Sequence, residues 1–283
     1  MLVILYHWGR RLYSLVGKKL RLSRILKQGK AVVFAFDHGV EHGPSDFPPE
    51  SIDPRSIISK VVEGGVDAIM MLPAMAYRTW DIWAGKTSLI VKLTSKTNLR
   101  PPDERLRQSV FGVFEEAIAL GADAVAVTVY WGSQFEDQML ERWFSVKEKA
   151  DRYGIPCLQL AYPRGPSIRN MYDVEVVKYG VRAAIESGAD LIKTYYTGSE
   201  ATFREVVKVA AGTPVLMSGG PARENFLDFL RDVESVMRAG ASGVVVGRNV
   251  FRHPHPDRAV RAIAAVVHEG RTAEDAFELV KQS

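Results

Sequence analysis

Cysteine is nearly absent from this sequence, since Cys157 is the only one among 283 residues. A single thiol cannot form an intramolecular disulfide, and the usual thiol metal sites are excluded with it. Cys157 lies within an apolar run, so we interpret it as a buried packing residue rather than a nucleophile.

Long hydrophobic runs are also missing. The apolar segment 1–6 is too short to cross a membrane, and no cation precedes it as a signal peptide would require. We therefore expect no membrane association and a cytoplasmic location.

A concentration of charge of one sign is missing as well. The chain has 37 Lys and Arg against 33 Asp and Glu, a net charge of +4. A nucleic-acid-binding protein would more often carry a concentrated basic face, so we expect no nucleic-acid partner. A small, dispersed surplus of cations suits phosphorylated metabolites better.

What the chain does contain is a series of eight short runs rich in Val, Ile, Leu and Ala. Their nearly continuous apolarity predicts strands buried on both faces, as in a parallel sheet. The runs span 31–38, 66–72, 88–94, 122–130, 156–163, 189–196, 214–220 and 243–250. Segments with helical patterning lie between them, among them 106–120, 174–187 and 222–239, and several helices end in the glycine expected at a helix stop.

Strand–helix alternation repeated eight times predicts a (β/α)₈ TIM barrel, closed and forming a single domain. An open doubly wound sheet is the alternative, and it is disfavoured because no Gly-x-Gly-x-x-Gly turn follows the first strand. We expect residues 1–30 to form an N-terminal helix that caps one end of the barrel. Residues 31–270 would form the barrel, and 271–283 a C-terminal helical tail.

Lys193 is the most informative residue at the strand ends, where barrels of this class place their reactive groups. A lysine rarely lies unpaired within a buried strand. Burial and a second nearby cation would lower its pKa and supply the neutral amine that imine formation needs. The structural alternative is an ion pair between Lys193 and a carboxylate such as Asp37.

The ends of strands seven and eight are rich in glycine. Backbone N–H groups exposed by glycines can surround an anion, and barrels often bind phosphate at this place. The segments Ser218-Gly219-Gly220 and Gly247-Arg248 fit this role, and the guanidinium of Arg248 would add bidentate donors. The alternative is that these glycines only form tight turns.

Other strand-end residues allow more than one role. Tyr162 could transfer a proton or simply pack. Asp37 could pair with the lysine, move a proton or anchor the next loop. Lys92 could lower the pKa of Lys193, compete with it as nucleophile or lie on the outer face of its strand.

The segment 38–42 has the His-x-x-Glu-His spacing of some zinc peptidases. That chemistry requires a helix, and here Gly39 and the following Gly43-Pro44 make a helix unexpected. We therefore predict no metal site.

Four segments in order, 36–44, 161–165, 193–198 and 216–220, together resemble the archaeal-type class I fructose-bisphosphate aldolases, a family of Schiff-base barrel enzymes. The resemblance extends from about residue 18 to the eighth helix. It implies reversible cleavage of fructose 1,6-bisphosphate to dihydroxyacetone phosphate and glyceraldehyde 3-phosphate, a reaction of glycolysis and gluconeogenesis. It also implies that no metal or other cofactor is needed and that the chain forms a homo-oligomer.

The resemblance assigns roles to individual residues. It implies that Lys193 forms the imine, that Tyr162 donates and accepts the proton, and that Asp37 assists. It places the phosphate of the dihydroxyacetone half at the two glycine-rich strand ends. The predicted phosphate and substrate ligands are Ser218, Gly219, Gly220, Gly247, Arg248, Arg164 and His38.

Two points depart from the family pattern or stay open. An aromatic residue often stands two positions before the catalytic tyrosine in this family, whereas this chain has Leu160, which puts the shape of the substrate in doubt. Arg164 and Lys92 are both candidates for the second phosphate.

Three kinds of alternative function stay open. Sister Schiff-base enzymes include 2-amino-3,7-dideoxy-D-threo-hept-6-ulosonate synthase and a phosphosugar thiolase. A phosphosugar isomerase would use Lys193 only electrostatically, and a silent phosphosugar-binding regulator would not turn over at all.

Overall fold

Eight parallel strands form a closed barrel in the computed structural model, which describes residues 2–281, with side chains described from residue 13 onward. Strand β1 pairs with both β2 and β10, so the sheet has no open edge. The strands are β1 (Ala31–Phe36), β2 (Ala68–Met71), β3 (Ser88–Lys92), β6 (Ala124–Trp131), β7 (Cys157–Pro163), β8 (Leu191–Thr194), β9 (Val215–Ser218) and β10 (Gly243–Val246). The predicted (β/α)₈ barrel is confirmed.

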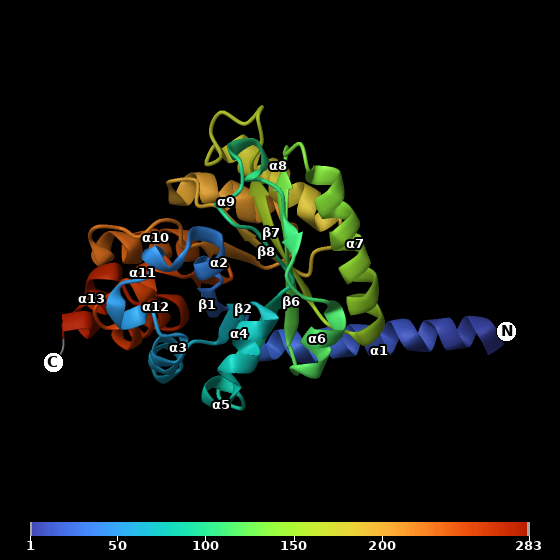
Figure 1. Ribbon diagram of the computed structural model, residues 1–283, viewed down its shortest axis with the longest axis horizontal. Helices are drawn as coiled ribbons and strands as arrows, with labels where there is room; N and C mark the ends of the chain where they lie inside the picture. The colour runs from blue at the N-terminus through green and yellow to red at the C-terminus, as the bar shows by residue number, and fades with distance from the viewer. Residues whose placement is uncertain (1, 282–283) are drawn as a thin grey trace.

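Helices pack around the barrel (Figure 1). The longer ones are α3 (Pro54–Glu63), α7 (Glu136–Tyr153), α8 (Val174–Glu186), α9 (Glu200–Val209), α10 (Phe226–Arg238), α12 (Pro256–Glu269) and α13 (Ala273–Lys281). The last of them, α13, packs against α10 and α12. Shorter helices are α4 (Pro73–Arg78), α5 (Trp80–Trp83) and α11 (Arg248–Phe251), with 3₁₀ turns η1 (Pro44–Asp46) and η2 (Pro49–Ser51). Cys157 is buried, as its apolar surroundings indicate.

The helix expected at 106–120 is the main error in the predicted elements. Only α6 (Phe114–Ala119) is helical there; before it come the 3₁₀ turn η3 (Pro102–Glu104) and a hairpin of β4 (Thr94–Ser95) and β5 (Ser109–Val110). The N–H of Phe111 donates to the carbonyl of Leu93 at 2.9 Å. Residues 109–111 of the segment therefore pair with the chain after β3 instead of forming a helical turn.

The helix α1 (Leu2–Ile25) covers the N-terminal end of the barrel with its last turns, and its first turns extend beyond α7 (Figure 1). Three cations of α1 and the turn after it bind aspartates that directly precede three strands. The pairs are Lys18–Asp190 at 2.8 Å, Arg24–Asp123 at 3.0 Å and Lys27–Asp67 at 3.1 Å. With this end closed by ion pairs, access to the barrel interior is left to the opposite end.

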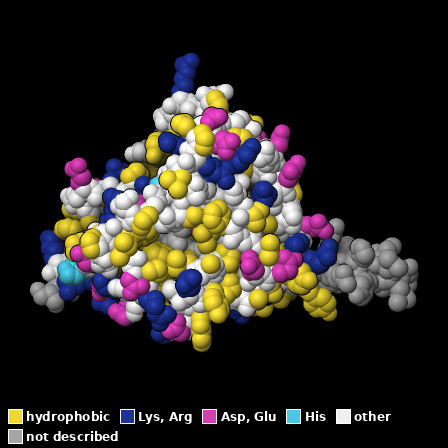
Figure 2. Space-filling model, viewed as in Figure 1, with side chains coloured by type: hydrophobic (Ala, Val, Ile, Leu, Met, Phe, Trp, Pro, Cys, Tyr) yellow, Lys and Arg dark blue, Asp and Glu magenta, His cyan; other side chains and the backbone are white. Residues whose placement is uncertain are grey.

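Across residues 2–281, no helix has the length and apolarity needed to span a membrane. Basic, acidic and apolar side chains are interspersed over the face of the molecule in Figure 2.

Candidate active site

A cavity of about 330 Å³ lies at the C-terminal ends of the strands. Residues of β3, β6, β7, β8, β9 and β10 and those that directly follow β1 line it, because the carboxyl ends of parallel strands meet at one end of the barrel. All ten residues predicted as catalytic or substrate-binding line this cavity: Asp37, His38, Tyr162, Arg164, Lys193, Ser218, Gly219, Gly220, Gly247 and Arg248.

Lys193 projects from β8 and is only 7 % exposed. Burial lowers the pKa of its amine to about 8; the carboxylate of Asp37 opposes this effect and the ammonium of Lys92 adds to it. The Nζ forms no ion pair with any described residue, since Asp37 is paired with Lys92 instead. The amine is therefore available as a nucleophile near neutral pH.

Lys92 on β3 has a different environment, although it is as deeply buried. It forms ion pairs with both Asp37 and Glu41. Burial alone would lower the pKa of Lys92, but the two carboxylates raise it well above its usual range. Burial likewise opposes ionisation of Asp37, whose pKa nevertheless falls well below the usual range because of Lys92. Lys92 thus stays an ammonium, and it cannot compete with Lys193 as a nucleophile.

Tyr162 lies at the end of β7, between Lys193 and the glycine-rich rim, which residues 218–220 and 247–248 form. Its hydroxyl is 3.2 Å from the Oγ of Ser218, and the centre of its ring is 6.0 Å from the Nζ of Lys193. Burial raises the pKa of this phenol above its ordinary value. Tyr162 is therefore a neutral O–H donor within reach of the space around the amine.

Arg164 follows β7 and lies over the aromatic rings of Tyr130, Tyr162 and Tyr195, at 5.1 to 5.4 Å from their centres. Its Nε donates to the hydroxyl of Tyr195, and no carboxylate among the described residues pairs with it. Guanidinium stacking on aromatic faces holds the group in place while several N–H donors stay free.

The glycine-rich rim is built by two strand ends that Asn249 joins. Its amide donates to the carbonyls of Gly219 at 2.8 Å and of Pro221 at 3.0 Å, and its Oδ1 accepts from the N–H of Arg223. A Cβ at Gly247 would lie 2.2 Å from the ring of His38, so only glycine fits there. The Nε of Arg248 is buried and has no hydrogen-bond partner within the described part of the chain.

The expectation that residues 38–42 are not helical is wrong. They form one helical turn, α2 (His38–His42), in which the rings of His38 and His42 stack at 5.8 Å. Gly39 lacks the positive φ that would interrupt a helical turn. Glu41 points instead to Lys92, and burial lowers the pKa of His38 to about 4. Within residues 2–281, no group of three or more His, Cys, Asp or Glu side chains lies together as a metal site would need.

Several cavity residues escaped prediction: Glu41, His42, Thr128, Tyr130, Tyr172 and Tyr195. Tyr195 could have been found, because residues two apart on a strand share a face and Lys193 lies two positions earlier. Glu41 could not, since its approach to Lys92 depends on the helical turn that the glycines argued against.

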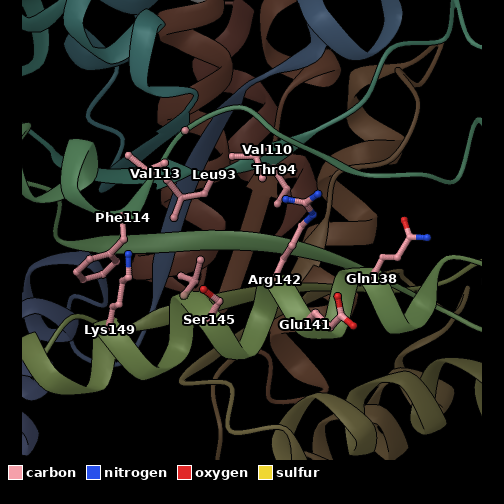
Figure 3. Close-up of a pocket in the computed structure, with 12 residues that line it drawn as sticks. Leu93, Thr94, Val110, Val113, Phe114, Gln138, Glu141, Arg142, Ser145 and Lys149 are labelled. Atoms are coloured by element: carbon pink, nitrogen blue, oxygen red, sulfur yellow. The ribbon is translucent and has the colours of Figure 1, made fainter.

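A larger cavity of about 530 Å³ lies on the outside of the barrel (Figure 3). There Gln138, Glu141, Arg142, Ser145 and Lys149 of α7 face the chain around the β4–β5 hairpin and α6. It contains none of the predicted residues and neither buried lysine. Size alone therefore does not locate the chemistry, which needs the strand ends.

A closed barrel with a buried, unpaired amine beside a phenol and a glycine-lined rim has the features of a Schiff-base enzyme. A model of the DeoC/LacD family of aldolases matches residues 31–253. The chain belongs to this family, and the resemblance seen in the sequence is confirmed. It is therefore an enzyme of the lyase class.

Individual relatives narrow the comparison. A class 1 fructose-bisphosphate aldolase of Thermoproteus tenax is 41% identical over 262 residues, which cover 91% of this chain and 96% of that protein. One from Halobacterium salinarum is 34% identical over 259 residues, covering 90% and 97%. A solved archaeal fructose-1,6-bisphosphate aldolase, with its catalytic lysine bound to the carbinolamine intermediate, has a TM-score of 0.81 and 39% identity, covering 87% and 98%.

Proposed function

We propose that this enzyme is a class I aldolase that cleaves fructose 1,6-bisphosphate reversibly to dihydroxyacetone phosphate and glyceraldehyde 3-phosphate. The observation that carries the proposal is the buried amine of Lys193, whose pKa of about 8 leaves it nucleophilic and whose neighbour Asp37 is occupied by Lys92. The aldolases from Thermoproteus tenax and Halobacterium salinarum support this choice of substrate.

The first half of the reaction forms the imine. The neutral Lys193 amine attacks the ketone carbon C2, and the carbinolamine takes up a proton from solvent and loses water to give a protonated imine. This cation then accepts the electron pair of the C3–C4 bond as a water molecule takes the proton of the C4 hydroxyl, and that proton later restores the Tyr162 phenol. Glyceraldehyde 3-phosphate departs, and an enamine stays on Lys193.

The second half returns the proton and releases the product. Tyr162 keeps its proton because burial raises its pKa, so we assign it the protonation of C3 in the enamine. Water then hydrolyses the imine and frees dihydroxyacetone phosphate. Lys92 keeps Asp37 ionised throughout these steps, and the carboxylate of Asp37 stabilises the cationic imine.

The two phosphates bind at opposite sides of the cavity in this proposal. The phosphate of the dihydroxyacetone half is bound by Arg248 and the backbone N–H groups of the glycine-rich rim, with Ser218 and His38 beside it. The second phosphate is bound by Arg164, which has no carboxylate partner among the described residues. Lys92 is not used for it, since two carboxylates already neutralise Lys92.

The sister Schiff-base enzymes differ from this proposal only in substrate, whereas an isomerase would form no imine. The discriminating test is intact mass after borohydride reduction with dihydroxyacetone phosphate, on the wild type and Lys193→Ala. One adduct on the wild type that disappears in the variant supports the imine and its lysine. No adduct on either protein would refute Schiff-base catalysis, and unchanged labelling of the variant would move the nucleophile elsewhere.

Substrate choice needs its own assay. Release of dihydroxyacetone phosphate, the product that both substrates give, is coupled to glycerol-3-phosphate dehydrogenase, and fructose 1-phosphate is the control that lacks the second phosphate. We expect strong preference for the bisphosphate in the wild type and loss of that preference in Arg164→Met. Adduct formation without cleavage of the bisphosphate would favour a sister enzyme.

We further propose that the chain acts in the cytoplasm as a homo-oligomer. We also propose that it divides into an N-terminal helix up to about residue 30, a barrel up to about residue 270 and a C-terminal helical tail. Tyr13, Leu15, Val16 and Leu20 of α1 are exposed and apolar, which supports α1 as a contact between copies. Removal of residues 1–16 is then expected to reduce the assembly size in light scattering. An unchanged size would assign the contact to another surface.

A further inference from the structure

Seven buried side-chain polar atoms in the described residues have no hydrogen-bond partner, and three of them line the proposed active-site cavity. They are the Nδ1 of His38, the Nε of Arg248 and the Oγ1 of Thr128. The first two belong to residues already assigned to substrate. Thr128 has no assigned role, although buried polar atoms are almost always hydrogen-bonded.

Thr128 differs in this respect from the other buried threonines that the structure describes. The hydroxyl of Thr79 donates to the carbonyl of Met75 at 2.9 Å, and that of Thr194 to the carbonyl of Ala161 at 3.0 Å. The Oγ1 of Thr94 accepts from a backbone N–H at 3.0 Å. Thr128 lines the cavity, so a group bound there is the partner that can satisfy its hydroxyl.

The position of Thr128 is set by the strands. It lies on β6 in register with Leu160 of β7, which is in register with Lys193 of β8. The backbone N–H of Thr128 donates to the Oγ1 of Thr94, just beyond the last paired residues of β3 and β6. This bond keeps Thr128 on the wall of the cavity where the regular strand pairing has ended.

The proposed substrate orientation brings a hydroxyl to this wall. With one phosphate at β9 and β10 and the ketone carbon on β8, the rest of the carbon chain extends toward β7 and β6. Arg164, the proposed ligand of the second phosphate, lies over the ring of Tyr130, two residues beyond Thr128 on β6. The hydroxyl-bearing carbons between ketone and second phosphate therefore pass Thr128.

We propose that the Thr128 hydroxyl hydrogen-bonds a hydroxyl group of the sugar substrate, on the half that leaves as the aldehyde. Thr128 is then a specificity-determining residue for the polyhydroxylated half of the substrate. A hydroxyl group can both donate and accept, so it matches another hydroxyl in either direction. This inference rests on the proposed aldolase function and on its substrate orientation.

The test compares Thr128→Val, which keeps the shape and removes the hydroxyl, with Thr128→Ser, which keeps the hydroxyl. For Thr128→Val we expect kcat/KM for cleavage of fructose 1,6-bisphosphate to fall about 10-fold or more, the usual effect of deleting a group that hydrogen-bonds a substrate hydroxyl. Borohydride trapping with dihydroxyacetone phosphate, which lacks the aldehyde half, is expected to stay at the wild-type level. The serine variant should recover most of the cleavage activity.

Thr79→Val is the matched control, because Thr79 is equally buried but its hydroxyl bonds within the protein, away from the cavity. We expect it to lower the melting temperature and leave kcat/KM unchanged. Cleavage by Thr128→Val within about 2-fold of wild type, or an equal loss of trapping and cleavage, overturns the proposed contact; the second result would assign Thr128 a structural role. A wild-type enzyme that forms no adduct and cleaves no bisphosphate overturns the aldolase function itself.

Discussion

The pKa of Lys193 makes the rate of imine formation a direct readout of the burial that the barrel imposes. With a pKa of about 8 instead of the ordinary 10.5, roughly one amine in ten is neutral at pH 7. An unperturbed lysine would have only about one in 3,000 neutral at that pH. Burial therefore increases the concentration of the nucleophile about 300-fold at neutral pH.

The experiment measures the second-order rate of reductive trapping with dihydroxyacetone phosphate and cyanoborohydride between pH 6 and pH 10. The rate should rise about tenfold per pH unit below pH 7 and level off above a midpoint near 8. Because the carboxylate of Glu41 raises the pKa of Lys193, Glu41→Gln should move this midpoint to lower pH. A rate that still climbs tenfold per unit between pH 8 and pH 10 would refute the reasoning, since the amine would then titrate as in water.

Three further predictions concern stability, proton transfer and phosphate binding. Between about pH 8 and 10.5, Lys193 carries more protons in the unfolded chain than in the folded one, so folding stability rises with pH over this range. Below pH 8, burial of the charged amine lowers the free energy of unfolding by its full amount, about 3 kcal/mol. Lys193→Met should thus raise the urea midpoint at pH 7, and a lower midpoint would contradict the penalty. Tyr162→Phe should reduce kcat about 100-fold or more while the trapped adduct still forms, and equal loss of both would assign Tyr162 a structural role. Gly247→Ala places a methyl group against His38 and should raise KM for bisphosphate more than it lowers kcat; an unchanged KM would exclude this loop from phosphate binding.

The sequence alone determined the barrel, because the features that specify it are local and repeated. Eight apolar runs with helical segments between them need no knowledge of their partners to predict a parallel closed sheet. The same regularity places Lys193 and Tyr162 at strand ends, and strand ends of a parallel barrel meet at one end. Strand ends and the family resemblance together selected the ten predicted site residues, and all ten line one cavity.

Tertiary structure decided which charged groups meet. The sequence offered Lys193 as the partner of Asp37, and only the closed barrel shows that Lys92 forms this ion pair and leaves Lys193 unpaired. The turn at 38–42, which glycine propensity disfavoured, forms within the fold and brings Glu41 to the same lysine. Propensity is a weak preference that such long-range contacts override.

The roles of Thr128 and of the segment around Phe111 depended on structure for a related reason. A threonine in a buried strand is unremarkable in sequence, and its missing partner appears only when every neighbour is in place. Residues 109–111 pair with the chain after β3 because that partner is close by in space, not because of their own pattern. Local sequence thus determines the elements and the end of the barrel where chemistry occurs, whereas ion pairing, hydrogen-bond satisfaction and strand partners depend on contacts between distant residues, which only the closed barrel specifies.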